Sequence, residues 1–279
     1  IFTDSESSIK CELNNDNKPY SKWEIRKLYE EKELFDIEIK SSPNGIETLK
    51  ESIRNRQKVL RNFLIFSPEY KTLRTFQEEG QIQPLGIYGE GLFKLLKVFS
   101  MNKNQNEIKK LNELLILIDW FEEFKLPSKH FEVERFIEIK DRFVDEAINS
   151  FDQKSTNEGF LFLMFYFSLF ISKDTPQFFA IDNIDASLNP KLCSELMVRL
   201  VQLAKEYDKQ VIFTTHNPSV LDGLNLDDDE QRLFMIYRNK NGHTKAQRIL
   251  KKETPEGQEP VKLSEAFVRG YIGGLPKNF

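Results

Sequence analysis

The feature that most constrains the fold is an alternation of helix and strand patterns in the second half of the chain. An apolar run at 160–172 has the length of a buried helix, and short apolar runs follow at 178–181 and 211–214. Between the two short runs, residues 191–207 carry leucines at helical spacing. A strand, a helix and a second strand in this order favour an α/β fold with a parallel sheet.

The helix expected at 191–207 has a clear start. Asn189 can cap it and Pro190 suits its first turn. Ligands of an open parallel sheet lie beyond the carboxyl ends of the strands. The polar residues that follow the two strands, Asp182 and His216, are therefore expected side by side at one edge of the sheet.

The first half of the chain shows other patterns. Residues 9–40 alternate between apolar and polar and contain a turn sequence, which predicts antiparallel strands. Further on, we expect helices at 46–63, 91–99 and 106–124, a strand within 131–144, and a hairpin formed by 233–238 and 244–250. The chain is thereby divided into an antiparallel β part at 1–45, a mainly helical insertion at 46–150 and an α/β lobe at 151–279.

Composition excludes several classes of protein. The net charge of −4 argues against a globally basic nucleic-acid binder, so contact with nucleic acid would need a local patch or a partner. No apolar run approaches the roughly 18–20 residues of a membrane span, and no signal peptide is visible. Two cysteines without metal-ligand spacing indicate a reduced cytoplasmic protein. The acidic stretch 226–230 is interpreted as a solvated loop.

The residues after the two strands resemble a known ATPase pattern. Asp182 follows its strand as the aspartate of a Walker B motif does, where it holds Mg²⁺. The segment 182–190 resembles the Walker B and D-loop of ABC-type ATPase heads, and Thr214-Thr215-His216-Asn217-Pro218 looks like their switch-histidine loop. Similar pieces occur in RecF-like, SMC-like and OLD-type heads of bacterial anti-phage proteins. The resemblance covers residues 155–225.

The resemblance implies an ABC/SMC-type ATPase head, in which a parallel sheet flanked by helices is joined by an antiparallel β part and a helical insertion. ATP and Mg²⁺ would be its cofactors. Asp182 would hold the metal and His216 would sense the γ-phosphate, although His216 could instead cap the turn that begins at Pro218. Ser187 and Asn189 would lie at the interface of an ATP-bound dimer.

The resemblance also implies a signature loop before the apolar helix. Ser155, Asn157 and Gly159 would form it, with Ser155 or Asn157 in the place of the signature serine, and would contact the ATP of the opposite subunit. An ordinary helix N-cap explains the same residues equally well.

Two departures from the ATPase pattern affect the expected activity. Asn183 stands where a catalytic glutamate usually follows the aspartate, and losing a general base typically costs ~10²–10⁴ in rate. Either Asp185 takes that role, or Asn183 only positions water and hydrolysis is slow. The sequence also contains no G-x-x-x-x-G-K-[ST] phosphate-binding loop. We expect this loop in an N-terminal lobe that is missing from the printed chain.

Two functions follow as hypotheses. In the first, the chain is an ATP-binding head that pairs with a second copy, or forms a higher oligomer, through its ATPase face. This pairing would control a protein effector such as a nuclease or toxin in phage defence, and no membrane partner is expected. In the second, the chain is a non-catalytic scaffold that keeps the ATPase fold and holds a partner protein.

Overall fold

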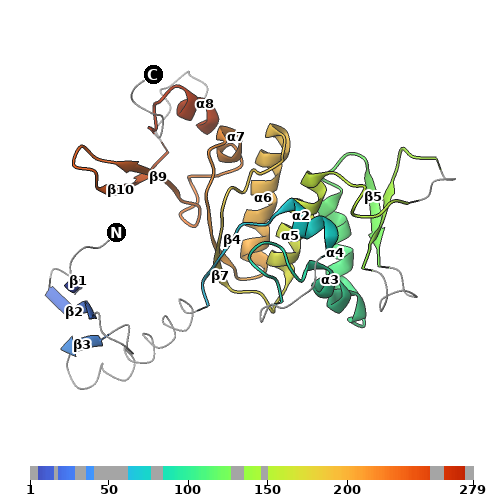
Figure 1. Cartoon of the computed structure of the whole chain (residues 1–279). Coiled ribbons are helices and arrows are strands. Elements are labelled where there is room, and N and C mark those ends of the chain that lie inside the picture. Colours follow the sequence, from blue (N-terminus) through green and yellow to red (C-terminus); the bar gives the residue numbers. More distant parts are fainter. Residues whose placement is uncertain are drawn as a thin grey trace. The chain divides into compact units, whose positions relative to one another are not determined.

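The computed structural model describes residues 6–15, 18–28, 36–40, 62–76, 84–126, 135–145, 150–251 and 261–273. The chain separates into two compact units, 1–61 and 62–279 (Figure 1). The division into three parts at 45 and 150 stays a prediction.

The first unit contains the antiparallel strands expected within 9–40. These are β1 (Glu6–Asn15), β2 (Lys18–Leu28) and β3 (Asp36–Lys40), in the order β1-β2-β3. Most of the helix expected at 46–63 lies outside the described residues.

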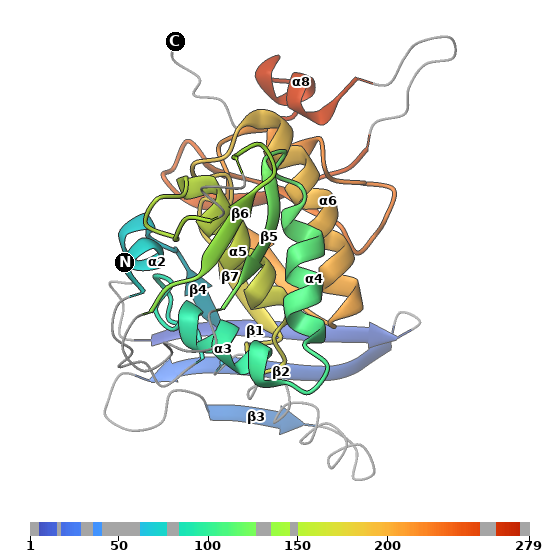
Figure 2. The same cartoon turned by 90° about the vertical axis from the view of Figure 1, so that its right-hand side faces the viewer.

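The second unit is built on a parallel sheet. Its strands are β4 (Leu64–Phe66), β7 (Phe178–Ile181) and β8 (Gln210–Phe213), in the order β4-β7-β8. Helix α6 (Pro190–Glu206) connects β7 to β8, as the α/β pattern requires (Figure 2). The predicted α/β fold class with a parallel sheet and helices is confirmed.

One face of this sheet is covered by α5 (Glu158–Ile171), in which every residue from Gly159 to Ile171 is buried. Its aromatic rings pack on all three strands: Phe165 contacts Phe66, and Phe170 contacts both Phe179 and Phe213. No helix of the described residues is long and apolar enough to cross a membrane. The apolar run at 160–172 is thus a core helix.

The opposite face of the same sheet is partly exposed within the described residues of the second unit. Ile65, Ala180 and Ile212 lie in one row across β4, β7 and β8. Ile65 is 56% exposed and Ile212 is 49% exposed, while Ala180 between them is buried. Because side chains alternate across a strand, this row faces away from α5.

The remaining part of the second unit surrounds α5 with α2 (Tyr70–Thr75), α3 (Leu92–Met101) and α4 (Asn106–Leu115). The prediction of one helix over 106–124 is wrong. The helix ends at Leu115, short i→i+3 bonds follow, and β5 (Phe121–Lys125) pairs antiparallel with β6 (Glu138–Asp141). The side chain of Asn112 binds the backbone of Phe124 and ties the strand to the helix.

The apolar spacing misled the helix prediction because Leu111, Leu115, Ile118 and Phe121 are all buried whether the chain is helical or not. The strand expected within 131–144 is observed only at Glu138–Asp141; residues 142–144 form a turn, and 131–134 lie outside the described residues.

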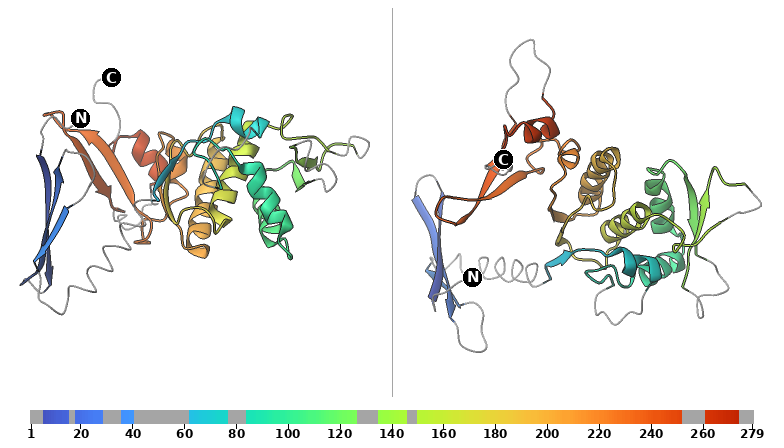
Figure 3. Two further views of the ribbon diagram at one scale, coloured as in Figure 1. Left: turned by 60° about the horizontal axis from the view of Figure 1, so that its bottom comes forward. Right: turned by 45° about the horizontal axis from the view of Figure 1, so that its top comes forward.

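The chain after β8 contains α7 (Pro218–Leu221), the strands β9 (Leu233–Arg238) and β10 (Thr244–Ile249), and α8 (Leu263–Val268). Strands β9 and β10 form the predicted antiparallel hairpin (Figure 3).

Candidate functional site

Thr214, the residue after β8, makes several hydrogen bonds to the carboxyl end of β7. Its N–H donates to the carbonyl of Ile181 (3.1 Å), and its carbonyl accepts from the N–H of Ile184 (3.1 Å). Its hydroxyl accepts from the N–H of Asn183 (2.9 Å) and donates to Oδ1 of Asp182. Thr214 therefore binds four consecutive residues at the end of β7.

Asp182 lies at the end of all three strands, because its backbone N–H also donates to the carbonyl of Phe66 in β4 (2.8 Å). The side chain of Asp182 is half-buried, whereas that of Asn183 is exposed. Asn183 has a φ of +51°, a left-handed conformation that asparagine adopts more readily than most residues. The turn after β7 thus presents both residues at the sheet edge.

Asp185 is held by the next residue after Thr214. The hydroxyl of Thr215 donates to Oδ1 of Asp185 (2.5 Å) and accepts from the N–H of Asn217 (3.0 Å). His216 lies between Thr215 and Asn217 in the sequence. Its side chain is exposed and has no hydrogen bond to any described residue. The alternative in which His216 caps the following turn does not apply, because Asn217 caps α7 by accepting from the N–H of Ser219 (2.9 Å).

Behind Asp185 lie two buried groups. Burial, together with the negative charge of Asp185, raises the pKa of the Cys193 thiol to about 11 and raises that of the Tyr166 phenol. The Tyr166 hydroxyl has no hydrogen-bond partner within the described structure. The Cys193 sulfur accepts from the side-chain amide of Asn217 (3.5 Å). Asp185 is itself half-buried, and its charge acts on both groups.

The loop before α5 makes local contacts. The hydroxyl of Ser155 donates to Oδ1 of Asp152 (3.0 Å), and Oδ1 of Asn157 accepts from the N–H of Phe160 (2.8 Å). Asn157 is thus the N-cap of α5. Both side chains have a structural partner, and their contact with a nucleotide stays a prediction.

The start of α5 touches the loop 182–189 within the same chain. A side chain at Gly159 would place its Cβ 3.2 Å from the carbonyl oxygen of Ser187, which is closer than ordinary packing. The hydroxyl of Ser187, at a φ of +57°, donates to the carboxylate of Glu158. Asn189 ends the loop as the N-cap of α6, accepting from the N–H of Leu192 (2.9 Å).

The charges of Asp182 and Asp185 are not balanced by a basic side chain of the described residues: each carboxylate receives a threonine hydroxyl, and neither forms an ion pair there. Within the same residues, no three acidic, histidine or cysteine side chains gather as a preformed metal cage. Mg²⁺ in nucleotide sites is commonly bound by one or two carboxylates with phosphates and water. The two aspartates fit this donor set.

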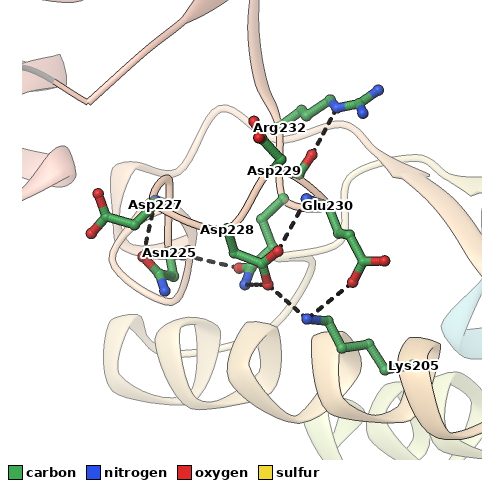
Figure 4. A network of polar contacts seen from close by, with 8 residues as sticks. Lys205, Asn225, Asp227, Asp228, Asp229, Glu230 and Arg232 are labelled. Carbon is green, nitrogen blue, oxygen red and sulfur yellow. Dashed lines mark hydrogen bonds and ion pairs between the residues drawn. The ribbon is translucent and has the colours of Figure 1, made fainter.

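The acidic loop at 225–230 differs from the loop after β7, because its carboxylates form ion pairs (Figure 4). Lys205 of α6 forms ion pairs with Asp228 (2.7 Å) and Glu230 (3.1 Å). Asp229 pairs with Arg248 (3.0 Å), and Asp227 pairs with Lys251. The hydrogen bond from Lys205 lowers the pKa of Asp228 to about 2. The prediction of an exposed loop is confirmed, and its acids are occupied by cations.

Sequence reasoning did not assign roles to Thr214, Thr215, Glu158 or Cys193. The two threonines stand in the quoted segment next to His216, and that position is a signal that could have identified them. The contact of Glu158 with Ser187 joins segments 29 residues apart and has no local signal.

Comparison with protein families identifies one segment. Residues 127–222 match the AAA_21 family, an AAA domain family whose description refers to the AbiEii toxin of type IV toxin–antitoxin systems. The match includes Asp182, Asp185 and His216. No curated protein matches the chain as a whole or in part.

Similar solved structures are heads of SMC proteins. The SMC head domain from Thermotoga maritima has 13% identity and a TM-score of 0.43, over 88% of this chain and 75% of that one. An SMC head bound to the C-terminal winged-helix domain of ScpA has 12% identity and a TM-score of 0.47, over the same shares. An SMC ATPase structure described under ATP-driven dimerisation and DNA-stimulated activation has 16% identity and a TM-score of 0.43, over 65% and 96%.

These structural scores lie below 0.5, so the fold assignment rests on the sheet topology described above. The segment that is similar to this AAA domain family, residues 127–222, holds Asp182, Asp185 and His216.

Proposed function

We propose that this chain supplies part of the nucleotide site of an ABC/SMC-like ATPase head that binds ATP with Mg²⁺. One observation carries the proposal. Asp182 and Asp185 follow β7 at the carboxyl end of the sheet and have no basic partner among the described residues, and His216 follows β8 at the same edge. Two uncompensated carboxylates at this edge suit a cation that bridges to phosphate.

In this proposal Asp182 holds Mg²⁺, which would neutralise charge on the phosphates. The hydroxyl of Thr214 binds only Oδ1 of Asp182, and no described residue binds the other carboxylate oxygen. His216 is exposed and has no hydrogen bond to a described residue, so its imidazole can donate a hydrogen bond to a phosphate oxygen.

Hydrolysis is proposed to be slow. The amide of Asn183 cannot accept a proton from water, so Asp185 is the remaining candidate for the base and Asn183 for orienting water. Asp185 is half-buried and engaged by Thr215, which limits its reach. The chain would then act mainly as an ATP-responsive switch.

ATP binding also needs a phosphate-binding loop, which the printed sequence does not contain. In the proposal, two heads enclose ATP between them, and the loop with Ser155, Asn157 and Gly159 faces the nucleotide of the opposite head. Ser187 and Asn189 are exposed and suit the pairing surface. The paired state controls a protein effector in the cytoplasm, in a defence role that the toxin–antitoxin description of the matched family supports.

The test uses the full-length protein and measures binding of ATP with and without Mg²⁺. Asp182→Ala is expected to abolish the Mg²⁺-dependent part of the affinity, whereas the matched control Asp227→Ala, in the loop whose acids have cations, leaves it unchanged. ATP binding that is identical in wild type and Asp182→Ala, at every Mg²⁺ concentration, contradicts the proposed metal role.

The second candidate is a scaffold without turnover, and Asn183 is the observation that favours it. Here phosphate release by the wild type and by Asp182→Ala would be equally close to background, while ATP binding and oligomerisation persist in the wild type. Release that exceeds the Asp182→Ala background would exclude the scaffold.

A further inference from the structure

Two consecutive threonines at the end of β8 each bind a different carboxylate of the loop after β7. Thr214 donates to Asp182, and Thr215 donates to Asp185. We infer that Thr214 and Thr215 are positioning residues, which fix these two carboxylates relative to each other and to His216. The inference rests on the proposed function only for the identity of the ligand.

Thr214 fixes Asp182 because its hydroxyl group both accepts and donates a hydrogen bond. It accepts from the N–H of Asn183 at 2.9 Å while it donates to Asp182, and its backbone bonds to Ile181 and Ile184 set its own position. A hydroxyl that donates to one carboxylate oxygen restricts rotation of the carboxylate and leaves the other oxygen available to a ligand. The same bond to Asn183 supports the left-handed turn at that residue.

Thr215 links Asp185 to the backbone around His216. Its hydroxyl donates to Asp185 at 2.5 Å and accepts from the N–H of Asn217 at 3.0 Å. His216 is the residue between them, so one hydroxyl connects the acid to the segment that carries the imidazole. Groups that orient ligating carboxylates are expected to affect metal affinity by about 10–100-fold when removed.

Valine is the discriminating substitution, because it keeps the branched shape of threonine and removes the hydroxyl. In the full-length protein with ATP present, Thr214→Val is expected to weaken Mn²⁺ binding at least about tenfold. Thr214→Ser restores the hydroxyl and is expected to restore the affinity. Thr244→Val, on the exposed strand β10, is the matched control and leaves Mn²⁺ binding unchanged.

Amide hydrogen exchange tests the positioning without relying on metal or nucleotide. Thr214→Val is expected to speed exchange of the Asn183 amide, and Thr215→Val that of the Asn217 amide, while the serine variants Thr214→Ser and Thr215→Ser keep the protection of the wild type. If Thr214→Val does not fold, Thr215→Val and Asn217 carry the test.

The outcomes separate the two proposals. Absence of Mn²⁺ binding in the wild type refutes the proposed metal site, and amide exchange still decides the positioning role. Unchanged exchange at both Asn183 and Asn217 in the valine variants overturns the inference. Mn²⁺ affinity that falls equally in the valine and serine variants also overturns it, because the hydroxyl would then not be the group responsible.

Discussion

The acidic loops 225–230 and 182–189 of the second unit differ in how their negative charge is balanced. In the loop 225–230, Asp227, Asp228, Asp229 and Glu230 each pair with Lys205, Arg248 or Lys251. In the loop 182–189, the carboxylates of Asp182 and Asp185 accept from the hydroxyl groups of Thr214 and Thr215 and form no ion pair with a described residue. The first loop supplies its own cations, and the second leaves its charge available.

The difference indicates which acids serve the fold and which suit a ligand. Exposed ion pairs contribute little to stability, so the pairs of the loop 225–230 mainly hold it against α6 and β10. Hydroxyl donors orient a carboxylate without neutralising it. The acids of the loop 182–189 are therefore oriented without being paired to a basic side chain of the described residues, which suits a bound cation.

The largest expected effect comes from adding a third acidic residue to the loop 182–189. Asn183→Glu restores a carboxylate at the position of the missing base and is expected to raise the rate of phosphate release by up to ~10²-fold. The left-handed turn at Asn183 makes glutamate cost about 1 kcal/mol in stability. Steady-state phosphate release measures the effect in full-length protein.

The control for this change is Asn183→Gln, which has the same backbone cost but cannot accept a proton. If Asn183→Glu binds ATP normally and is no faster than Asn183→Gln, the absence of a base at this position does not explain slow turnover.

A smaller effect concerns Cys193, which reports on the charge of Asp185. Burial and that charge raise the pKa of the thiol to about 11, so little thiolate is present at pH 8. Asp185→Asn removes the charge and is expected to lower the pKa of the buried Cys193 thiol, which the loss of the S–H Raman band with rising pH follows in a Cys11→Ser background. Asp227→Asn is the control and should titrate like the parent protein; equal thiol pKa values for all three proteins would show that the charge of Asp185 does not reach the thiol.

The smallest effect, a change in stability, is expected in the loop 225–230. Lys205→Met removes the cation shared by Asp228 and Glu230 and should lower the melting temperature slightly, less so at high salt. The pKa of Asp228 is about 2 in the folded protein, below its ordinary value of 3.8. The ionised pair therefore stabilises the fold above pH 4, and this contribution is lost as the pH falls from about 4 to about 2.

Thermal melting of wild type and Lys205→Met between pH 2 and pH 7 follows this difference. The two curves should converge at the acidic end of the range. A melting difference that stays constant down to pH 2, or a change in Mg²⁺-dependent ATP binding, would contradict the separation between the two loops.

Local patterns in the sequence predicted the strands of the parallel sheet and the N-caps of two helices. The apolar runs before Asp182 and before Thr214 form β7 and β8. Asn157 is the N-cap of α5, and Asn189 is the N-cap of α6. Each of these features depends on neighbouring residues, so a single stretch of sequence contains the information. Asp182 and His216 were placed at one sheet edge for the same reason.

The contacts between segments could not be predicted in this way. The hydroxyl bonds of Thr214 and Thr215 depend on the register between β7 and β8, and the bond between Ser187 and Glu158 depends on how α5 packs. The helix expected to reach residue 124 shows the converse error, because helical spacing continues through Ile118 into a turn and a strand. A spacing pattern records burial and does not record the backbone path.

The exposed isoleucines of the parallel sheet have a practical consequence for handling this protein. Ile65 of β4 and Ile212 of β8 each expose about half of their surface. Within the described structure, both strands lie at an edge of the sheet and pair with β7 alone. Exposed apolar sheet surface and free strand edges promote self-association. Preparations of this chain by itself should therefore bind hydrophobic dyes and lose material at high concentration, and polar substitutions at Ile65 and Ile212 should improve recovery without touching the acidic edge.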